Sequence, residues 1–167
     1  MFDAAAELAL GLVATYGLAV LLVVFVLEGA LIGKVIPTRT LFVAVALAVG
    51  SDTFGLVSVA AVAIVGATLG QLLLFALVRR TELSVESLPG ASEAAENRFE
   101  AWLDRWGMSA VALSNTLPVA RGSLTVPAAM ADGDALRFSA SSMIGSSMYA
   151  VGLVAIVAGV DTAIAFI

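Results

Sequence analysis

Two apolar stretches of this chain are each interrupted by prolines and by polar or charged residues, and this pattern constrains the fold most. The first stretch covers residues 18–50 and contains Glu28, Lys34, Pro37 and Arg39. The second covers residues 108–130 and contains Asn115, Pro118, Arg121 and Pro127. Proline bends or ends a helix, and a charge in hydrocarbon costs about 2.5–3.5 kcal/mol on insertion scales. Because broken backbone at membrane depth must be buried in protein or line a watery cavity, two such segments are typical of a transporter's binding site.

The composition indicates an integral membrane protein. Hydrophobic residues make up 61% of the chain and charged residues 13%, with a mean hydropathy of +1.08. Soluble domains average about 45–50% apolar and about 25% charged residues. The 167 residues suffice for one domain with a few spans, since each span takes about 20 residues.

The residue types that are absent exclude several kinds of chemistry. The chain has no cysteine and no histidine, so disulfides, histidine zinc sites and Ser-His-Asp catalysis are excluded. We therefore expect no enzymatic activity, no metal site and no cofactor. A net charge of −5 and a pI near 4.5 argue against nucleic-acid binding. Acidic excess with a single lysine, Lys34, is a composition compatible with a haloarchaeal origin.

The pattern predicts an all-α integral membrane protein with a single membrane domain over residues 1–167. Its expected parts are an N-terminal helix and first span in 1–33, a re-entrant hairpin in 34–50, a span in 54–80, an amphipathic surface helix in 92–106, a second re-entrant hairpin in 108–131, and a last span in 134–160. A hairpin fits the first break because residues 41–49 would form a helix of only about 13 Å, less than half of the hydrocarbon core.

Small residues on the two long spans predict close helix packing. Gly66 and Gly70 have the four-residue spacing that lets two helix backbones approach each other. Ser141, Gly145, Gly152 and Gly159 form a similar stripe on the last span. In the amphipathic helix, Trp102 and Trp106 are expected to anchor the apolar face at the interface.

The charged residues of the two breaks each have a structural and a functional interpretation. Glu28 is either a carboxylate at the water boundary or a protonatable group facing a shared cavity. Lys34 and Arg39 either extend to the interface or neutralise Glu28 or an anionic headgroup. Arg121 cannot be deprotonated in practice, so it either caps broken-helix carbonyls, pairs with Glu28, or binds a phosphate.

The second break also carries polar groups and a recognisable motif. Ser114, Asn115 and Thr116 precede Pro118, and they supply uncharged donors for a headgroup. The run Asn115-Thr116-Leu117-Pro118-Val119-Ala120-Arg121, followed by Pro127-Ala128-Ala129-Met130, resembles the signature of the DedA family of SNARE-associated or VTT-domain membrane proteins. Arg137-Phe138, Gly145 and Tyr149 continue the pattern, and Glu28, Pro37 and Gly66–Gly70 match its first half.

This resemblance implies two inverted re-entrant hairpins that meet near the midplane, and translocation of a lipid or polyprenyl phosphate. Carried over by position, it implies functional roles for Glu28 and Arg121. The chain departs from the family pattern at three polar positions: Arg39 replaces an acid, Asn115 replaces an arginine, and Gln71 replaces an aspartate of many members.

We therefore predict a flippase-like or scramblase-like protein of the plasma membrane that binds membrane lipids with an anionic phosphate headgroup. The predicted substrate-binding residues are Arg121, Glu28, Arg39, Asn115, Ser114 and Thr116, and the predicted structural breaks are Pro37, Pro118 and Pro127. Two alternatives remain open, a non-transporting protein that organises the membrane and a small ion or metabolite transporter. The coupling ion and the oligomeric state also remain open.

Overall fold

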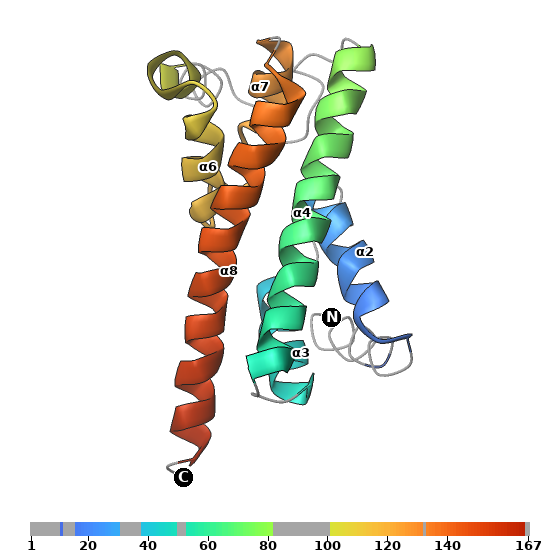
Figure 1. Cartoon of the computed structure of the whole chain (residues 1–167), viewed down its shortest axis with the longest axis vertical. Helices are drawn as coiled ribbons and strands as arrows, with labels where there is room; N and C mark the ends of the chain where they lie inside the picture. Colours follow the sequence, from blue (N-terminus) through green and yellow to red (C-terminus); the bar gives the residue numbers. More distant parts are fainter. Residues whose placement is uncertain are drawn as a thin grey trace.

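The computed structural model describes residues 11, 16–30, 38–49, 53–81, 101–131 and 133–165, and this part of the chain consists of helices and turns. The helices are α2 (Leu18–Gly29), α3 (Thr38–Val49), α4 (Thr53–Thr81), α6 (Ser109–Thr116), α7 (Thr125–Met130) and α8 (Ala135–Ala165). Figure 1 shows α4 and α8 as two long antiparallel rods that carry the shorter helices. The predicted all-helical architecture is thus confirmed for the described residues.

The two predicted spans are present as the two long helices. α4 has 29 residues and α8 has 31, which at 1.5 Å per residue exceeds the roughly 30 Å hydrocarbon core. Thr53–Thr81 and Ala135–Val160 are both apolar and long enough to cross a membrane. The sequence predicts these spans at 54–80 and 134–160, and the second helix continues to Ala165.

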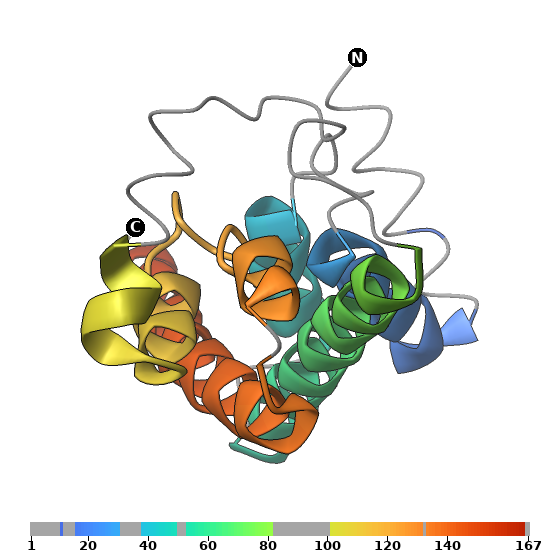
Figure 2. The same ribbon diagram turned by 90° about the horizontal axis from the view of Figure 1, so that it is seen from above.

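The short helices form two groups at opposite ends of the long ones. α2 and α3 lie along the lower half of α4, whereas α6 and α7 lie at the upper end (Figure 1). Seen from above, α4 and α8 diverge like a V, with α3 and α7 in its opening (Figure 2). The chain descends through α6 and returns to the same end at α7, so this segment is a helical hairpin.

Proline explains the break in this upper hairpin. Leu117 has extended dihedrals (φ −89°, ψ 124°), as expected for a residue that precedes a proline, and α6 ends there before Pro118. Pro127 lies in the first turn of α7, where its missing N–H needs no helical acceptor. Gly122, with φ 75°, supplies a left-handed turn between the two helices.

Several predicted features fall wholly or partly outside the described residues. Pro37 and Lys34 belong to this set, and of the expected N-terminal helix only residue 11 is described, as helical. Of the expected amphipathic helix at 92–106, residues 101–106 are described, and they are helical.

Glycines hold α2 and α4 in close contact. A Cβ on Gly70 would overlap the carbonyl oxygen of Val26, and a Cβ on Gly66 would press on Phe25. Gly29 on α2 is in turn seated against the backbone of Ala67. The predicted packing role of Gly66 and Gly70 is therefore confirmed.

The stripe predicted on α8 is packed along only part of its length. Gly145 lies against the backbone of Ala112 on α6. Gly152 and Gly159, in contrast, have no described atom within 4 Å of the position that a Cβ would occupy. The expectation that the whole stripe packs is thus wrong for its second half within the described residues, because α6 is short and ends near Gly145.

Substituting Gly70 with Ala is expected to destabilise the protein by about 1–3 kcal/mol, the usual cost of overpacking. The added methyl group would force α2 away from α4 at Val26. Gly152→Ala is the matched control, and it should be neutral or stabilising by up to about 1 kcal/mol, since alanine favours helix. Unfolding of both variants in detergent micelles measures the difference, and equal stability of the two would contradict the packing account.

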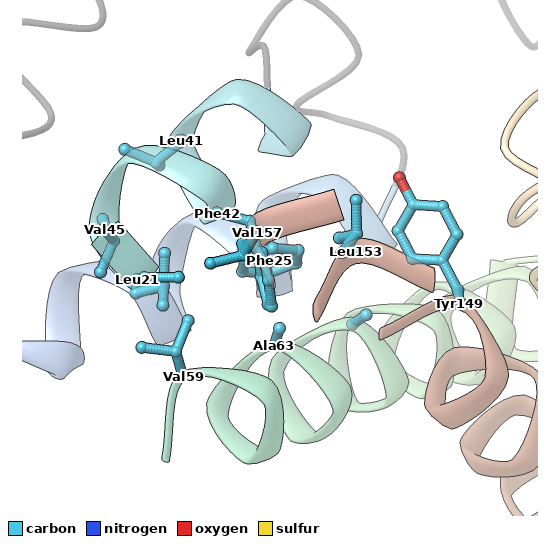
Figure 3. Close-up of a cluster of buried hydrophobic side chains, with 12 residues drawn as sticks. Leu21, Phe25, Leu41, Phe42, Val45, Val59, Ala63, Tyr149, Leu153 and Val157 are labelled. Atoms are coloured by element: carbon cyan, nitrogen blue, oxygen red, sulfur yellow. The ribbon is translucent and has the colours of Figure 1, made fainter. Parts of the chain in front are cut away.

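Two separate apolar cores stabilise the helices. The lower core joins α2, α3, the first half of α4 and the second half of α8, and consists of Leu21, Phe25, Leu41, Phe42, Val45, Ala46, Val59, Ala63, Ala67, Tyr149, Leu153 and Val157. Figure 3 shows these side chains converging, with the ring of Tyr149 at the edge of the cluster. The upper core consists of Leu74, Phe75, Val78, Ala110, Val111, Leu124, Val126, Ala128, Ala129 and Phe138.

Candidate functional site

A layer of buried polar residues separates the two cores. It consists of Thr68, Gln71, Ser114, Asn115, Thr125, Ser142 and Ser146. On α4 this layer falls between Ala67 of the lower core and Leu74 of the upper core. On α8 it falls between Phe138 and Tyr149. Buried polar groups are costly unless hydrogen-bonded, so a continuous polar layer halfway along α4 marks a place where polarity serves a purpose.

Arg121 and Glu28 meet at this layer. Arg121 lies in the link between α6 and α7, and Glu28 lies in the last turn of α2. Arg121 Nε is 3.8 Å from Glu28 Oε1, and the side chains are 8% and 19% exposed. The pairing expected from the sequence is therefore present, and it joins the two broken segments.

This ion pair leaves hydrogen-bonding capacity unused. A separation of 3.8 Å is longer than a hydrogen bond. Arg121 Nη1 and Glu28 Oε2 are both buried without a hydrogen-bond partner among the described residues. Because such groups are rare in folded proteins, the two charges are well placed to bind a further polar group.

Arg39 approaches the same place from the first turn of α3. Its Nε donates to the hydroxyl oxygen of Tyr149 at 3.0 Å, and its Nη2 donates to the carbonyl oxygen of Pro118 at 2.8 Å. The guanidinium of Arg121 covers the ring of the same Tyr149, with Cζ 4.1 Å from the ring centroid. Tyr149 of α8 therefore contacts both arginines, one through its hydroxyl and one through its ring.

A neutral amide pair lies beside this cluster. Asn115 Nδ2 donates to Gln71 Oε1 at 2.8 Å, and Gln71 Nε2 donates back to Asn115 Oδ1 at 3.1 Å. The Ser142 hydroxyl donates to Gln71 Oε1 at 2.7 Å, and the backbone N–H of Gly122 donates to Asn115 Oδ1 at 2.9 Å. The amide pair thus joins α4, α6, α8 and the turn that carries Arg121.

The predicted site residues divide into two groups. Glu28, Arg39 and Arg121 come together, whereas the polar run of α6 is engaged within the protein. The hydroxyls of Ser114 and Thr116 donate to the carbonyl oxygens of Val111 and Ala112 on the same helix. Asn115 is fully buried in the amide pair. Their assignment to headgroup binding stays a prediction, and their contacts in the structure are structural ones.

Sequence reasoning does not include Tyr149, Gln71 or Ser142 among the site residues. In the sequence, Tyr149 is only an aromatic that continues the family motif, and Gln71 is only a departure from it. Two of the departures, Gln71 and Asn115, are hydrogen-bonded to each other. Two paired departures from one family pattern are a signal that could have predicted this contact.

The electrostatics of the cluster favour an anion. Its charged side chains are Arg39, Arg121 and Glu28, so among the described residues the positive charge exceeds the negative by one. Both arginines present planar donor groups that match the oxygens of a carboxylate or phosphate. Arg39 is exposed while Arg121 is almost buried, so the two form a path from the surface inward.

The comparisons with known proteins identify the family. The family model described as the VTT domain matches residues 36–159, which is most of the chain. Neither the curated proteins nor the solved structures gave a match. The match covers α3 to α8 and includes Arg39, Arg121 and Tyr149, and the two apolar helices agree with a membrane protein. This chain belongs to the VTT domain family, the family of the DedA membrane proteins.

Proposed function

We propose that this protein moves a lipid with an anionic phosphate headgroup between the two leaflets of the plasma membrane, as a multi-pass protein. One observation carries the proposal. Arg39 and Arg121, from two different proline-broken segments, meet at Tyr149 in a polar layer partway along the long helices. Charged groups at that depth are expensive in a membrane, and they are typical of substrate pathways.

The membrane frame follows from the helix lengths. In this proposal α4 and α8 cross the bilayer, while α2–α3 and α6–α7 enter from opposite faces as re-entrant hairpins, in agreement with their places at opposite ends of the long helices (Figure 1). The polar layer then lies near the bilayer midplane. A re-entrant segment is tolerated there because its broken backbone is buried against α4 and α8.

The exposures of the charged side chains suggest the order of events. A headgroup first meets the exposed Arg39, and it then reaches Arg121, which is only 8% exposed. Without a headgroup, Glu28 balances the charge of Arg121. When the phosphate takes over that balance, Glu28 is released, either as an anion or after taking up a proton.

The tests of this proposal use liposomes that contain the purified protein and a trace of fluorescently labelled phosphatidylglycerol. We expect the wild-type protein to expose inner-leaflet label to an external quencher faster than protein-free liposomes do. Arg121→Leu should reduce the rate to that of protein-free liposomes. Arg105→Leu is the matched control, since Arg105 is an exposed arginine outside the cluster, and it should keep the wild-type rate.

Two outcomes would contradict the proposal. One is exchange in the Arg121→Leu protein at the wild-type rate. The other is a wild-type protein that does not accelerate exchange but does transport free inorganic phosphate into the liposomes. The second outcome would instead support a small-anion transporter that uses the same cluster.

One observation favours a second candidate function. The Glu28–Arg121 ion pair joins α2 to the α6–α7 link, and a pair of this kind can serve only to hold a fold. The protein would then organise the membrane without transporting anything. The stability and activity of the paired variants described in the Discussion distinguish this function from transport.

A further inference from the structure

Tyr149 occupies the boundary between the lower core and the charged cluster. Its side chain is 7% exposed, and its ring packs at the edge of the lower core. The hydroxyl points away from the labelled apolar side chains of that core (Figure 3). A phenylalanine would satisfy the packing equally well, so the hydroxyl requires a polar explanation.

The hydroxyl is half used by the protein. A phenol can accept hydrogen bonds and can also donate its own proton. The Tyr149 oxygen accepts from Arg39 Nε at 3.0 Å. Among the described residues, no acceptor lies within hydrogen-bonding distance of its proton. The donor end of the hydroxyl is therefore unassigned, within a cluster that has an excess of positive charge.

Arg39 makes this hydroxyl a better donor. A cation that donates to the phenol oxygen polarises the O–H bond, and chains of hydrogen bonds strengthen one another in a low-dielectric setting. Hydrogen bonds to an ionised acceptor are about twice as strong as neutral ones. An anionic oxygen placed between the two arginines is the acceptor that gains most from such a donor.

We infer that the Tyr149 hydroxyl donates a hydrogen bond to the anionic group that Arg39 and Arg121 attract, so that Tyr149 is a direct ligand contact. This inference rests on the proposed function for its ligand, a phosphate with anionic oxygens, either in a lipid headgroup or free. The ring of Tyr149 has a separate task, because it supports the guanidinium of Arg121 through a cation–π contact.

Tyr149→Phe isolates the hydroxyl, because the ring beneath Arg121 is kept. The probes are dihexanoyl phosphatidylglycerol and inorganic phosphate, each titrated into the full-length protein in detergent. We expect the Kd of the wild-type protein for the lipid probe to rise about tenfold or more in Tyr149→Phe, as for a lost hydrogen bond to a charged group. A parallel rise for inorganic phosphate means that the site reads the phosphate alone, and a rise for the lipid only means that the glycerol headgroup is part of the ligand.

Ser147→Ala is the matched control for the loss of a hydroxyl from α8. The Ser147 hydroxyl donates to the carbonyl of Met143 on the same helix, and its removal should leave both Kd values unchanged. A purely positioning role for Tyr149 is tested in an Arg39→Gln background. Direct donation predicts that Tyr149→Phe still weakens binding there, whereas an effect that disappears would overturn the inference.

A spectroscopic experiment tests the contact without a substitution that could affect folding. The chain has only two tyrosines, Tyr149 and Tyr16, and Tyr16 is 66% exposed. After labelling with 3-fluorotyrosine, a saturating probe should shift the fluorine resonance of Tyr149 and leave that of Tyr16 in place. An unshifted Tyr149 resonance would overturn the inference, as would a wild-type protein that binds neither probe.

The inference and the proposed function fail in distinguishable ways. Probe binding that depends on Tyr149, in a protein that does not exchange lipid, would refute transport and keep the ligand contact. Lipid exchange with a Kd that is unchanged in Tyr149→Phe would refute the ligand contact and keep transport.

Discussion

Replacing Glu28 with Leu is expected to destabilise the protein by about 3 kcal/mol, because it leaves the buried Arg121 without its counter-charge. Arg121→Leu should cost a similar amount, since Glu28 Oε1 then loses its nearest cation. The ion pair itself is far from ideal, with a 3.8 Å separation and two orphaned atoms, Arg121 Nη1 and Glu28 Oε2. Its net contribution to stability is therefore small, although the loss of one partner is costly.

The double variant Glu28→Leu/Arg121→Leu should recover most of the lost stability. Two leucines at this position bury no charge, and replacing a buried ion pair by apolar residues is often neutral or stabilising. Denaturation by sodium dodecyl sulfate in mixed micelles, followed for all four proteins of the cycle, measures the recovery. A double variant as unstable as the sum of the two single variants would contradict this account.

Gln71→Leu is expected to cost about 2–5 kcal/mol, since it leaves the buried Asn115 amide and the Ser142 hydroxyl without Gln71 as partner. The same substitution releases the turn at Gly122, which Asn115 holds, so Arg121 should become less ordered. The unfolding midpoint in mixed micelles measures the loss.

Two further variants make the Gln71 result specific. Ser139→Ala removes an exposed hydroxyl that bonds only to the carbonyl of Ala135, and it should change stability by less than about 0.5 kcal/mol. Gln71→Leu/Asn115→Leu should be less destabilised than the sum of its two single variants, because both amides are removed together. Strict additivity would show that the two amides do not act as a pair.

The long helices and their packing could be predicted from the sequence. Hydropathy and helix length are local properties, so the spans at α4 and α8 agree with expectation to within one residue at three of their four ends. The packing of Gly66 and Gly70 was predictable for the same reason, because the four-residue spacing lies within one helix. The pairing of Glu28 with Arg121 was also foreseeable, since a charge at membrane depth requires a partner.

The role of Tyr149 and the amide pair could not be predicted from local patterns. Arg39 and Tyr149 are 110 residues apart in sequence, and Gln71 and Asn115 are 44 apart. Asn115 illustrates the difficulty, because a polar residue beside a helix break is equally suited to bind a ligand or to hold the break. Only the position of α4 shows that Gln71 occupies both ends of its amide.

Lipid exchange by the Glu28→Leu/Arg121→Leu double variant tests the central claim most directly, because the fold is kept while the cation is removed. If the protein moves lipid phosphate through Arg121, the reconstituted double variant should expose labelled phosphatidylglycerol no faster than protein-free liposomes do. Exchange at the wild-type rate by the folded double variant would contradict the claim and would assign Glu28 and Arg121 to structure alone.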